Sequence, residues 1–192
     1  MIRLENFRRY VPRNALDLLI ELRKASLEFD SVVKNLRVTE QAIEFDLYVL
    51  HEESKRKTLQ KLELDFGKKI GEKDLAVETP FVDKQSILQE SVKLFNEQRY
   101  WECHETLEQV WRREARGPEK DVEQGIILAA SALVHFQRNE DLICLGMIPR
   151  TIEKLDSWKD PKYNMIDIGR LKEDLKHIYE TKEIRPFKIH GL

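Results

Sequence analysis

The chain has few of the features that mark special classes of protein. Its only two cysteines, Cys103 and Cys144, form no CxxC pair, which excludes a disulfide framework and a zinc ribbon and favours packing roles for both thiols. It contains no run of roughly 18 apolar residues and no apolar stretch at its start, so neither a transmembrane helix nor a signal peptide is expected. We therefore expect a reduced, cytoplasmic protein with no membrane partner.

The chain also lacks an excess of charge of either sign. It carries 33 basic and 35 acidic residues, a formal charge of −2, and this balance argues against nucleic acid as a partner. Arg8, Arg9, Arg13 and Lys55–Lys57 would be the place for such binding, but acidic residues match them in number. Glycine and proline are scarce, at 7 and 6 residues, which indicates long helices and short connections. The many lysines and glutamates are compatible with a thermophilic source.

The first eighty residues alternate between two periodicities. Residues 2–7, 32–38 and 42–49 have the character of strands, and in the last of these Ile43, Phe45, Leu47 and Val49 alternate with polar residues. Two helices are predicted from apolar residues at helical spacing: Leu16, Leu19, Ile20, Leu22 and Leu27 after Pro12, then Leu59, Leu62, Phe66 and Ile70 within 52–70. With a closing strand near Leu75–Val77, this order predicts a small ferredoxin-like α+β domain over residues 1–79, ending at Thr79-Pro80.

From Lys84 onward every pattern is helical. Helices are predicted at about 84–97, 100–115 and 119–138, then in shorter pieces over 141–157 interrupted at Pro149, and finally at about 165–180. Gly117-Pro118 ends one helix and starts the next. The fold class is therefore α+β, with an all-α bundle over residues 80–160 and a C-terminal helix and tail, 161–192, packing on it. A homo-oligomer is compatible with this organisation.

One face of the helix predicted at 100–115 gathers chemistry-bearing residues. At 3.6 residues per turn, it presents Trp101, His104, Glu105, Glu108 and Trp111. The next helix presents Gln124, Leu128, Ser131 and His135, with Asn139 near the edge. A short loop packs two such helices antiparallel. We therefore expect His104 and Glu108 to approach His135 or Gln124.

Two imidazoles and two carboxylates that converge in this way support three interpretations. The candidate catalytic residues His104, Glu105, Glu108 and His135 can act as general acid and base in a hydrolase. Alternatively, His104, Glu108 and His135 can bind a divalent transition metal, the candidate cofactor of a metal-dependent hydrolase. In the third interpretation the cluster is a structural hydrogen-bond network. The protein is then a non-enzymatic helical interaction module, fused to an α+β domain that binds a ligand or partner.

The segment Phe95–Trp111, FNEQRYWECHETLEQVW, resembles the signature of the domain of unknown function 309 family. The stretch Gln124–His135, followed by Asn139, is similar to the second motif of that family, and the resemblance covers about residues 85–157. It implies a small all-helical bundle of bacteria and archaea, with acids and histidines that look like a site but no established activity. The positions that match are Asn96, Tyr100, Glu102, His104, Glu105, Glu108, Trp111, Gln124, Gly125 and His135.

The resemblance adds Asn96 and Tyr100 to Trp101, Trp111, Gln124 and Asn139 as candidate substrate-binding residues. Two departures from the family pattern affect the predicted site. Leu128 stands where the family has a second glutamine, and Asp141-Leu142 stand where a Gly-Ala pair is expected. Because Leu128 faces the predicted site, that site is less polar than the family pattern implies.

Overall fold

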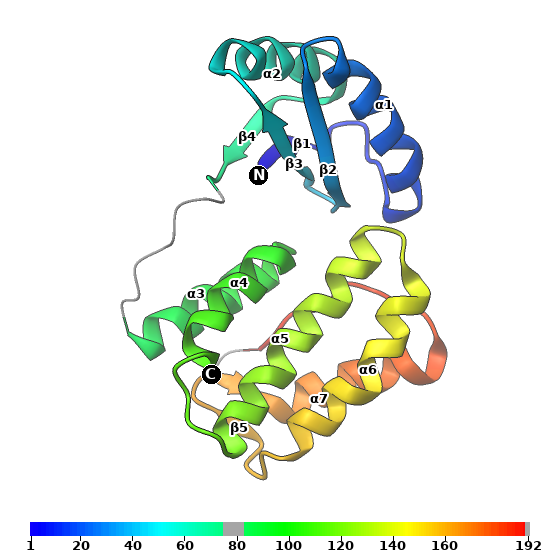
Figure 1. The fold of residues 1–192 in the computed structure, drawn as a ribbon. Coiled ribbons are helices and arrows are strands. Elements are labelled where there is room, and N and C mark those ends of the chain that lie inside the picture. The colour runs from blue at the N-terminus through cyan, green and yellow to red at the C-terminus, as the bar shows by residue number, and fades with distance from the viewer. Residues whose placement is uncertain (75–82, 191–192) are drawn as a thin grey trace. The chain divides into compact units, whose positions relative to one another are not determined.

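The computed structural model describes residues 1–74 and 83–190. The chain divides into two compact units (Figure 1). Unit 1 consists mainly of Met1–Thr79, and unit 2 of Pro80–Phe136 and Glu140–Leu192. The three-part division expected from the sequence, with a separate tail from residue 161, stays a prediction.

Unit 1 is a four-stranded antiparallel sheet with two helices. Its elements are β1 (Ile2–Glu5), a 3-10 turn η1 (Pro12–Asn14), α1 (Ala15–Leu27), β2 (Ser31–Val38), β3 (Ala42–Val49), α2 (Glu52–Phe66) and β4 (Lys69–Glu72). The strand order is β2-β3-β1-β4, and every neighbouring pair is antiparallel. This is the arrangement of a ferredoxin-like domain, so the predicted fold is confirmed.

Strand β3 shows why the sheet has one apolar and one charged face. Successive side chains in a strand point to opposite faces, and Ile43 and Phe45 are buried in the core shared with α1 and α2. Between them Glu44 is fully buried, and its carboxylate pairs with Arg3 at 2.9 Å and Arg37 at 3.6 Å. A buried carboxylate needs such partners, because desolvation otherwise disfavours its charge.

The end of α2 corrects one prediction. The helix was expected to reach residue 70, but it ends at Phe66, and Ile70 lies in β4. Gly67 causes this ending, because its φ of 141° lies outside the helical region and a Cβ there would stand 2.2 Å from the carbonyl oxygen of Glu5. The strand expected near Leu75–Val77 lies outside the described residues, and β4 pairs with β1 instead.

Unit 2 is the predicted helical bundle. Its elements are α3 (Lys84–Asn96), α4 (Tyr100–Trp111), α5 (Pro118–Gln137), α6 (Asp141–Asp156), β5 (Lys162–Tyr163), β6 (Ile166–Asp167) and α7 (Ile168–Thr181). All five helices contribute to one hydrophobic core. No helix in the described ranges combines the length and the apolar character that crossing a bilayer requires.

Three details of unit 2 differ from the sequence prediction. Helix α4 stops at Trp111 and not near residue 115. Helix α6 runs without interruption through Pro149, which had been expected to divide it; a single proline removes one main-chain donor, and packing on the other helices outweighs that loss. The short β5–β6 hairpin was not predicted, and α7 begins after it, at Ile168, where Asp167 caps the helix by accepting from the N–H of Arg170.

Candidate functional site

Helix α4 lies half in the core. Cys103, Leu107 and Val110 are buried in the bundle, and the helical repeat therefore places other side chains at the boundary with solvent. Those are Trp101, His104, Glu105, Glu108 and Trp111, all partly buried. We call these five residues the α4 face. They are the residues that the sequence placed on one side of this helix.

His104 lies between two carboxylates of the α4 face. Its Nδ1 is 3.2 Å from Glu105 Oε1, a hydrogen bond in which an ionised carboxylate accepts from the tautomer that carries its proton on Nδ1. Its Nε2 lies 3.4 Å from Glu108 Oε1, longer than the usual N–H···O distance of about 2.9–3.0 Å. Trp101 stacks on the imidazole with ring centroids 5.6 Å apart. The ring is therefore held in orientation by Trp101 and Glu105.

Glu108 extends this cluster along the helix. Its second oxygen, Oε2, pairs with Arg112 one turn further on. The side chains are partly open to solvent: 20% of His104, 43% of Glu105 and 23% of Glu108 are exposed. The cluster is thus a surface ion network on a single helix rather than a buried polar core.

His135 forms a separate pair. Its Nδ1 lies 2.5 Å from Glu140 Oε2, across the turn between α5 and α6. Within residues 1–74 and 83–190, no group of three or more His, Cys, Asp or Glu side chains is arranged to hold a metal ion. The tentative ligand set of His104, Glu108 and His135 therefore does not come together here, and the donor set does not fit the divalent metal that the sequence suggested. Gln124 is half-buried on α5.

Three of the candidate substrate-binding residues make contacts or take conformations that support the fold of unit 2. Asn96 donates to the carbonyl of Ile189 at 3.0 Å and accepts from its N–H at 2.8 Å, which fastens the C-terminal segment to α3. Tyr100 is fully buried, edge-on to Phe95. Asn139 is exposed with a φ of 63°, a left-handed conformation that asparagine tolerates well, and it turns the chain between α5 and α6.

The two tryptophans keep positions that suit a binding surface. Trp101 and Trp111 are partly buried against the core and border the carboxylates of the α4 face. The ammonium of Lys120 lies 4.8 Å from the Trp111 ring centroid. Within the described part of the chain, the buried indole N–H of Trp111 has no hydrogen-bond partner. The α4 face thus offers two aromatic walls and one unused donor.

A second charged cluster in unit 2 was missed at the sequence level. Lys84, at the start of α3, lies 2.5 Å from Glu114, 3.1 Å from Glu119 and 3.0 Å from the fully buried Glu123. Tyr163 donates to Glu123 at 2.6 Å. The sequence contained one signal of this cluster, which is that Glu123 lies inside the apolar stretch of α5. Its partners lie 39 or 40 positions away in the sequence, so no local pattern identifies them.

The pKa directions show that this second cluster is not set up for proton transfer. Burial alone would lower the pKa of Lys84, but hydrogen bonds to Glu114, Tyr163 and Glu123 raise it well above its ordinary value. Burial and the bond to Glu123 raise the pKa of Tyr163. A general base needs a pKa near the working pH. Near neutral pH a charged lysine and a neutral tyrosine instead bind Glu123, which fastens the start of α3 to α5.

The cysteines also lack the environment of a nucleophile. Both are free and buried. Burial raises the pKa of Cys103, and burial together with nearby Asp141 raises the pKa of Cys144 to about 12. Since the thiolate is the reactive form, neither thiol is activated. The packing roles expected from the sequence fit these surroundings.

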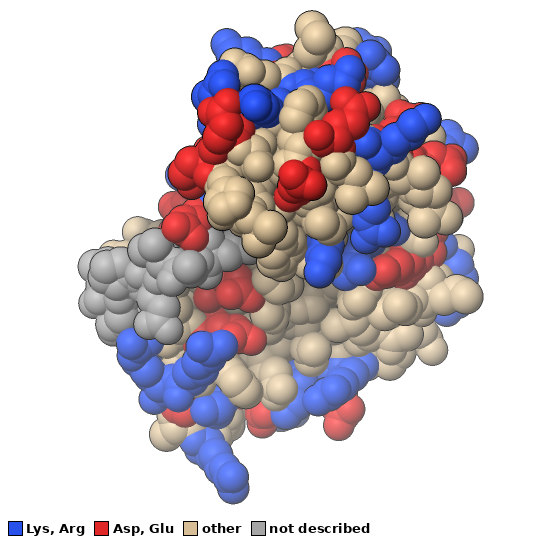
Figure 2. Space-filling model, turned by 45° about the horizontal axis from the view of Figure 1, so that its top comes forward, with Lys and Arg blue, Asp and Glu red and all other residues tan. Residues whose placement is uncertain are grey.

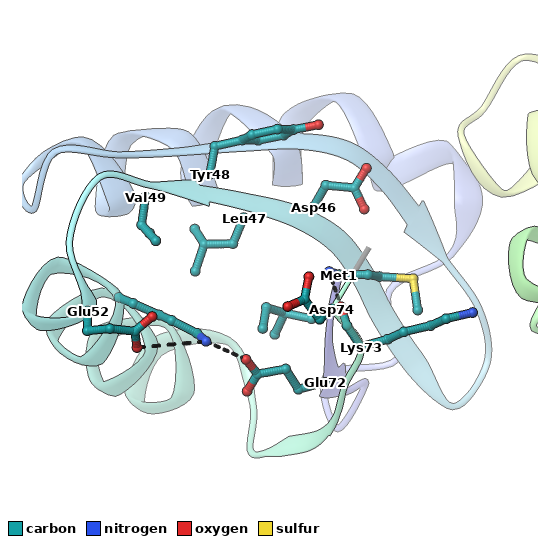
Figure 3. A pocket seen from close by; sticks show the side chains of 11 residues that line it. Met1, Asp46, Leu47, Tyr48, Val49, Glu52, Glu72, Lys73 and Asp74 are labelled. Carbon is teal, nitrogen blue, oxygen red and sulfur yellow. Dashed lines mark hydrogen bonds and ion pairs between the residues drawn. The ribbon is translucent and has the colours of Figure 1, made fainter. Parts of the chain in front are cut away.

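Unit 1 contains a cavity of about 300 Å³ that the sequence did not reveal (Figure 3). Figure 3 shows Glu52 of α2 and Glu72 of β4 pointing toward one another; Lys55 pairs with them at 4.0 and 2.7 Å. Three separate segments meet here, so no sequence window contains the lining. The lining residues are Met1, Ile2, Asp46, Leu47, Tyr48, Val49, Glu52, Lys55, Glu72, Lys73 and Asp74.

Surface charge is mixed rather than segregated. On the face drawn in Figure 2, basic and acidic side chains interleave, and neither sign forms a broad continuous patch. On α2, Arg56 and Lys57 both pair with Glu53, at 2.8 and 3.4 Å. The basic residues Arg56 and Lys57 are therefore paired with an acid on their own helix, as in a solvated helix face of mixed charge.

The fold and the site together define a ferredoxin-like unit followed by a helical unit with a half-buried His/Glu face. A model of the family described as Domain of unknown function (DUF309) matches residues 88–146. The matched segment includes the whole of α4 and α5, so the family resemblance inferred from the two motifs is confirmed for this part of unit 2. No curated protein matches the chain.

Proposed function

We propose that the α4 face is the acid/base site of a hydrolase that acts on a small substrate, with His104 as the proton-transferring group. The observation that carries this proposal is the unequal placement of the carboxylates around the ring. Glu105 bonds to Nδ1 and fixes the tautomer, whereas Nε2 faces Glu108 at a longer distance. An imidazole oriented by a carboxylate through one nitrogen, with the other nitrogen left to transfer a proton, is a recurring arrangement for a general base.

The chemistry follows from this geometry. Nε2 of His104 accepts a proton from a water molecule as that water attacks the substrate, and Glu105 stabilises the resulting imidazolium. Nε2 then returns the proton to the leaving group. Arg112 forms an ion pair with Glu108, on the Nε2 side of the ring. Trp101 and Trp111 supply apolar walls that can hold an apolar part of the substrate.

A purely structural role for the cluster has less support, because its members are partly exposed. A buried polar network costs several kcal/mol when it is broken, whereas exposed ion pairs contribute only about 0.2–1 kcal/mol. With exposed fractions of 20–43%, His104, Glu105 and Glu108 belong nearer to the second class. The metal-dependent form of the hydrolase hypothesis also has less support, since His135 is paired with Glu140.

The experiment measures hydrolysis of a panel of chromogenic p-nitrophenyl esters and phosphoesters by the full chain. His104→Asn should lower the rate on any substrate that turns over by about 100-fold or more, the usual contribution of a general base. His177→Asn is the matched control, because His177 is an exposed histidine on α7. It should leave the rate unchanged.

Stability provides the second readout. The free energy of unfolding of His104→Asn, measured in urea, should lie within about 1 kcal/mol of that of the parent chain, as expected for a partly exposed ion network. Activity retained in His104→Asn would contradict the proposal. A parent rate no higher than that of buffer across the whole panel would also count against it, in favour of the non-enzymatic interaction module.

A further inference from the structure

Helix α1 is apolar on two opposite faces. Its inner face, with Leu18, Leu22 and Ala25, is buried against the sheet. The sequence pattern had grouped Leu16, Ile20 and Leu27 with Leu22, but these three remain 64%, 58% and 63% exposed. At 3.6 residues per turn they line up within a narrow stripe almost opposite the buried face. We call Leu16, Ile20 and Leu27 the α1 stripe.

Such a stripe differs from ordinary surface hydrophobicity. Single exposed leucines, such as Leu64 on α2 at 80%, are common and need no explanation. An amphipathic surface helix, in contrast, normally turns polar residues outward along its full length. Arg23 lies at the level of the stripe, but its Nε donates to the carbonyl of Val33 at 3.0 Å, which draws the guanidinium toward β2. The three apolar side chains are therefore left uncovered.

The charges beside the stripe are divided along the helix. Asp17 lies in its N-terminal half, Glu21 at its middle, and Arg23 and Lys24 in its C-terminal half. A second α1 packed antiparallel on the first would bring Asp17 of each copy toward Lys24 of the other. The same packing would place Leu16 of each copy opposite Leu27 of the other. In a parallel pairing Asp17 would instead lie at the level of the other Asp17, and these contacts between opposite charges would not form.

We propose that the α1 stripe is the interface of a homodimer, in which the α1 helices of two copies pack antiparallel about a two-fold axis near residue 21. Self-complementarity favours a second copy over another partner, because a two-fold interface requires one surface to match itself. The stripe supplies the apolar centre, and the Asp17–Lys24 pairs set direction and register. This inference concerns unit 1 and does not depend on the proposed function of the α4 face.

Sedimentation velocity of the full chain over a range of concentrations tests the proposal. The parent chain should approach twice its monomer mass of 22.8 kDa as concentration rises. Ile20→Glu should abolish this shift, because it places two carboxylates near the axis. Leu64→Glu is the matched control: it introduces the same change at an exposed leucine of unit 1 and should leave the dimer intact.

A charge exchange tests the antiparallel register. Asp17→Lys should weaken the dimer, and the double variant Asp17→Lys with Lys24→Asp should restore it. Circular dichroism confirms that each variant keeps its fold. A parent chain that stays monomeric at every concentration, or a dimer that survives Ile20→Glu, would overturn the proposal. Failure of the double variant to recover association would overturn the antiparallel arrangement.

Discussion

At the scale of single residues, Glu123 and His104 are polar groups in different environments. Glu123 is fully buried and depends on Tyr163 and Lys84 for partners, whereas His104 borders solvent. Leaving a buried polar group without a donor costs about 1–3 kcal/mol, more than the loss of an exposed ion pair. A substitution at His104 should therefore cost less stability than one at Glu123. This difference suits His104 to a functional role and Glu123 to a structural one.

Tyr163→Phe tests the structural role of the buried cluster. Removal of the hydroxyl takes away the donor 2.6 Å from Glu123, so the free energy of unfolding should fall by about 1–3 kcal/mol at neutral pH. Urea denaturation followed by circular dichroism measures this change. A Phe variant as stable as the parent chain would show that Lys84 alone satisfies Glu123.

The same residue gives a pH dependence with a definite sign. The pKa of Tyr163 is raised in the folded state by burial and by Glu123, whereas an unfolded tyrosine ionises near pH 10. Its contribution to stability is therefore complete below about pH 10 and declines as the pH rises further. The parent chain should lose more stability above this pH than Tyr163→Phe does. Parallel stability curves for the two proteins would contradict this assignment.

At the scale of elements, the packing of α5 on α6 depends on Gly125. A Cβ at this position would stand 2.7 Å from Leu155 Cδ2 and 3.1 Å from its main-chain nitrogen. Leu155 belongs to α6, so this helix is the neighbour that leaves no room for a side chain at position 125. A Cβ added at Gly146, in the middle of α6, would meet no atom within 4 Å, so the two glycines differ in surroundings and not in secondary structure.

Gly125→Ala should therefore destabilise the protein by about 1–3 kcal/mol through overpacking. Gly146→Ala should stabilise it by up to about 1 kcal/mol, because alanine favours helix more than glycine does. Thermal or urea unfolding of both variants makes the comparison. If the two substitutions shifted stability in the same direction, close contact would not be the reason for glycine at position 125.

Helix periodicity predicted which elements form but not always which way they face. For α4 the pattern was sufficient, because Leu107 and Val110 define one clear apolar side. For α1 it was not, because apolar residues occupy two opposite sides, and only the position of the sheet decides which is buried. The end of α2 escaped prediction for a related reason. The Gly67 turn depends on Glu5, which lies 62 residues earlier in the sequence.

At the scale of the whole molecule, local patterns predicted the fold class and the ferredoxin-like order of unit 1, since strands and helices there alternate with clear periods. The candidate site was predicted only where one helix carries it. Glu105 and Glu108 meet His104 because spacing along α4 brings them together. The predicted approach of His135 to His104 and Glu108 depended on two helices presenting their polar faces to one another. In the structure His135 pairs with Glu140 instead.

The measurement that tests the central claim most directly is a long-range 1H–15N correlation spectrum of the histidine side chains in the full chain. It is recorded at a pH where imidazoles are ordinarily neutral, above about 7.5. The proposed mechanism needs the proton of His104 on Nδ1, facing Glu105, so that Nε2 can accept a proton. A spectrum in which Nε2 carries the proton, in the parent chain as in Glu105→Gln, would contradict this account of the site.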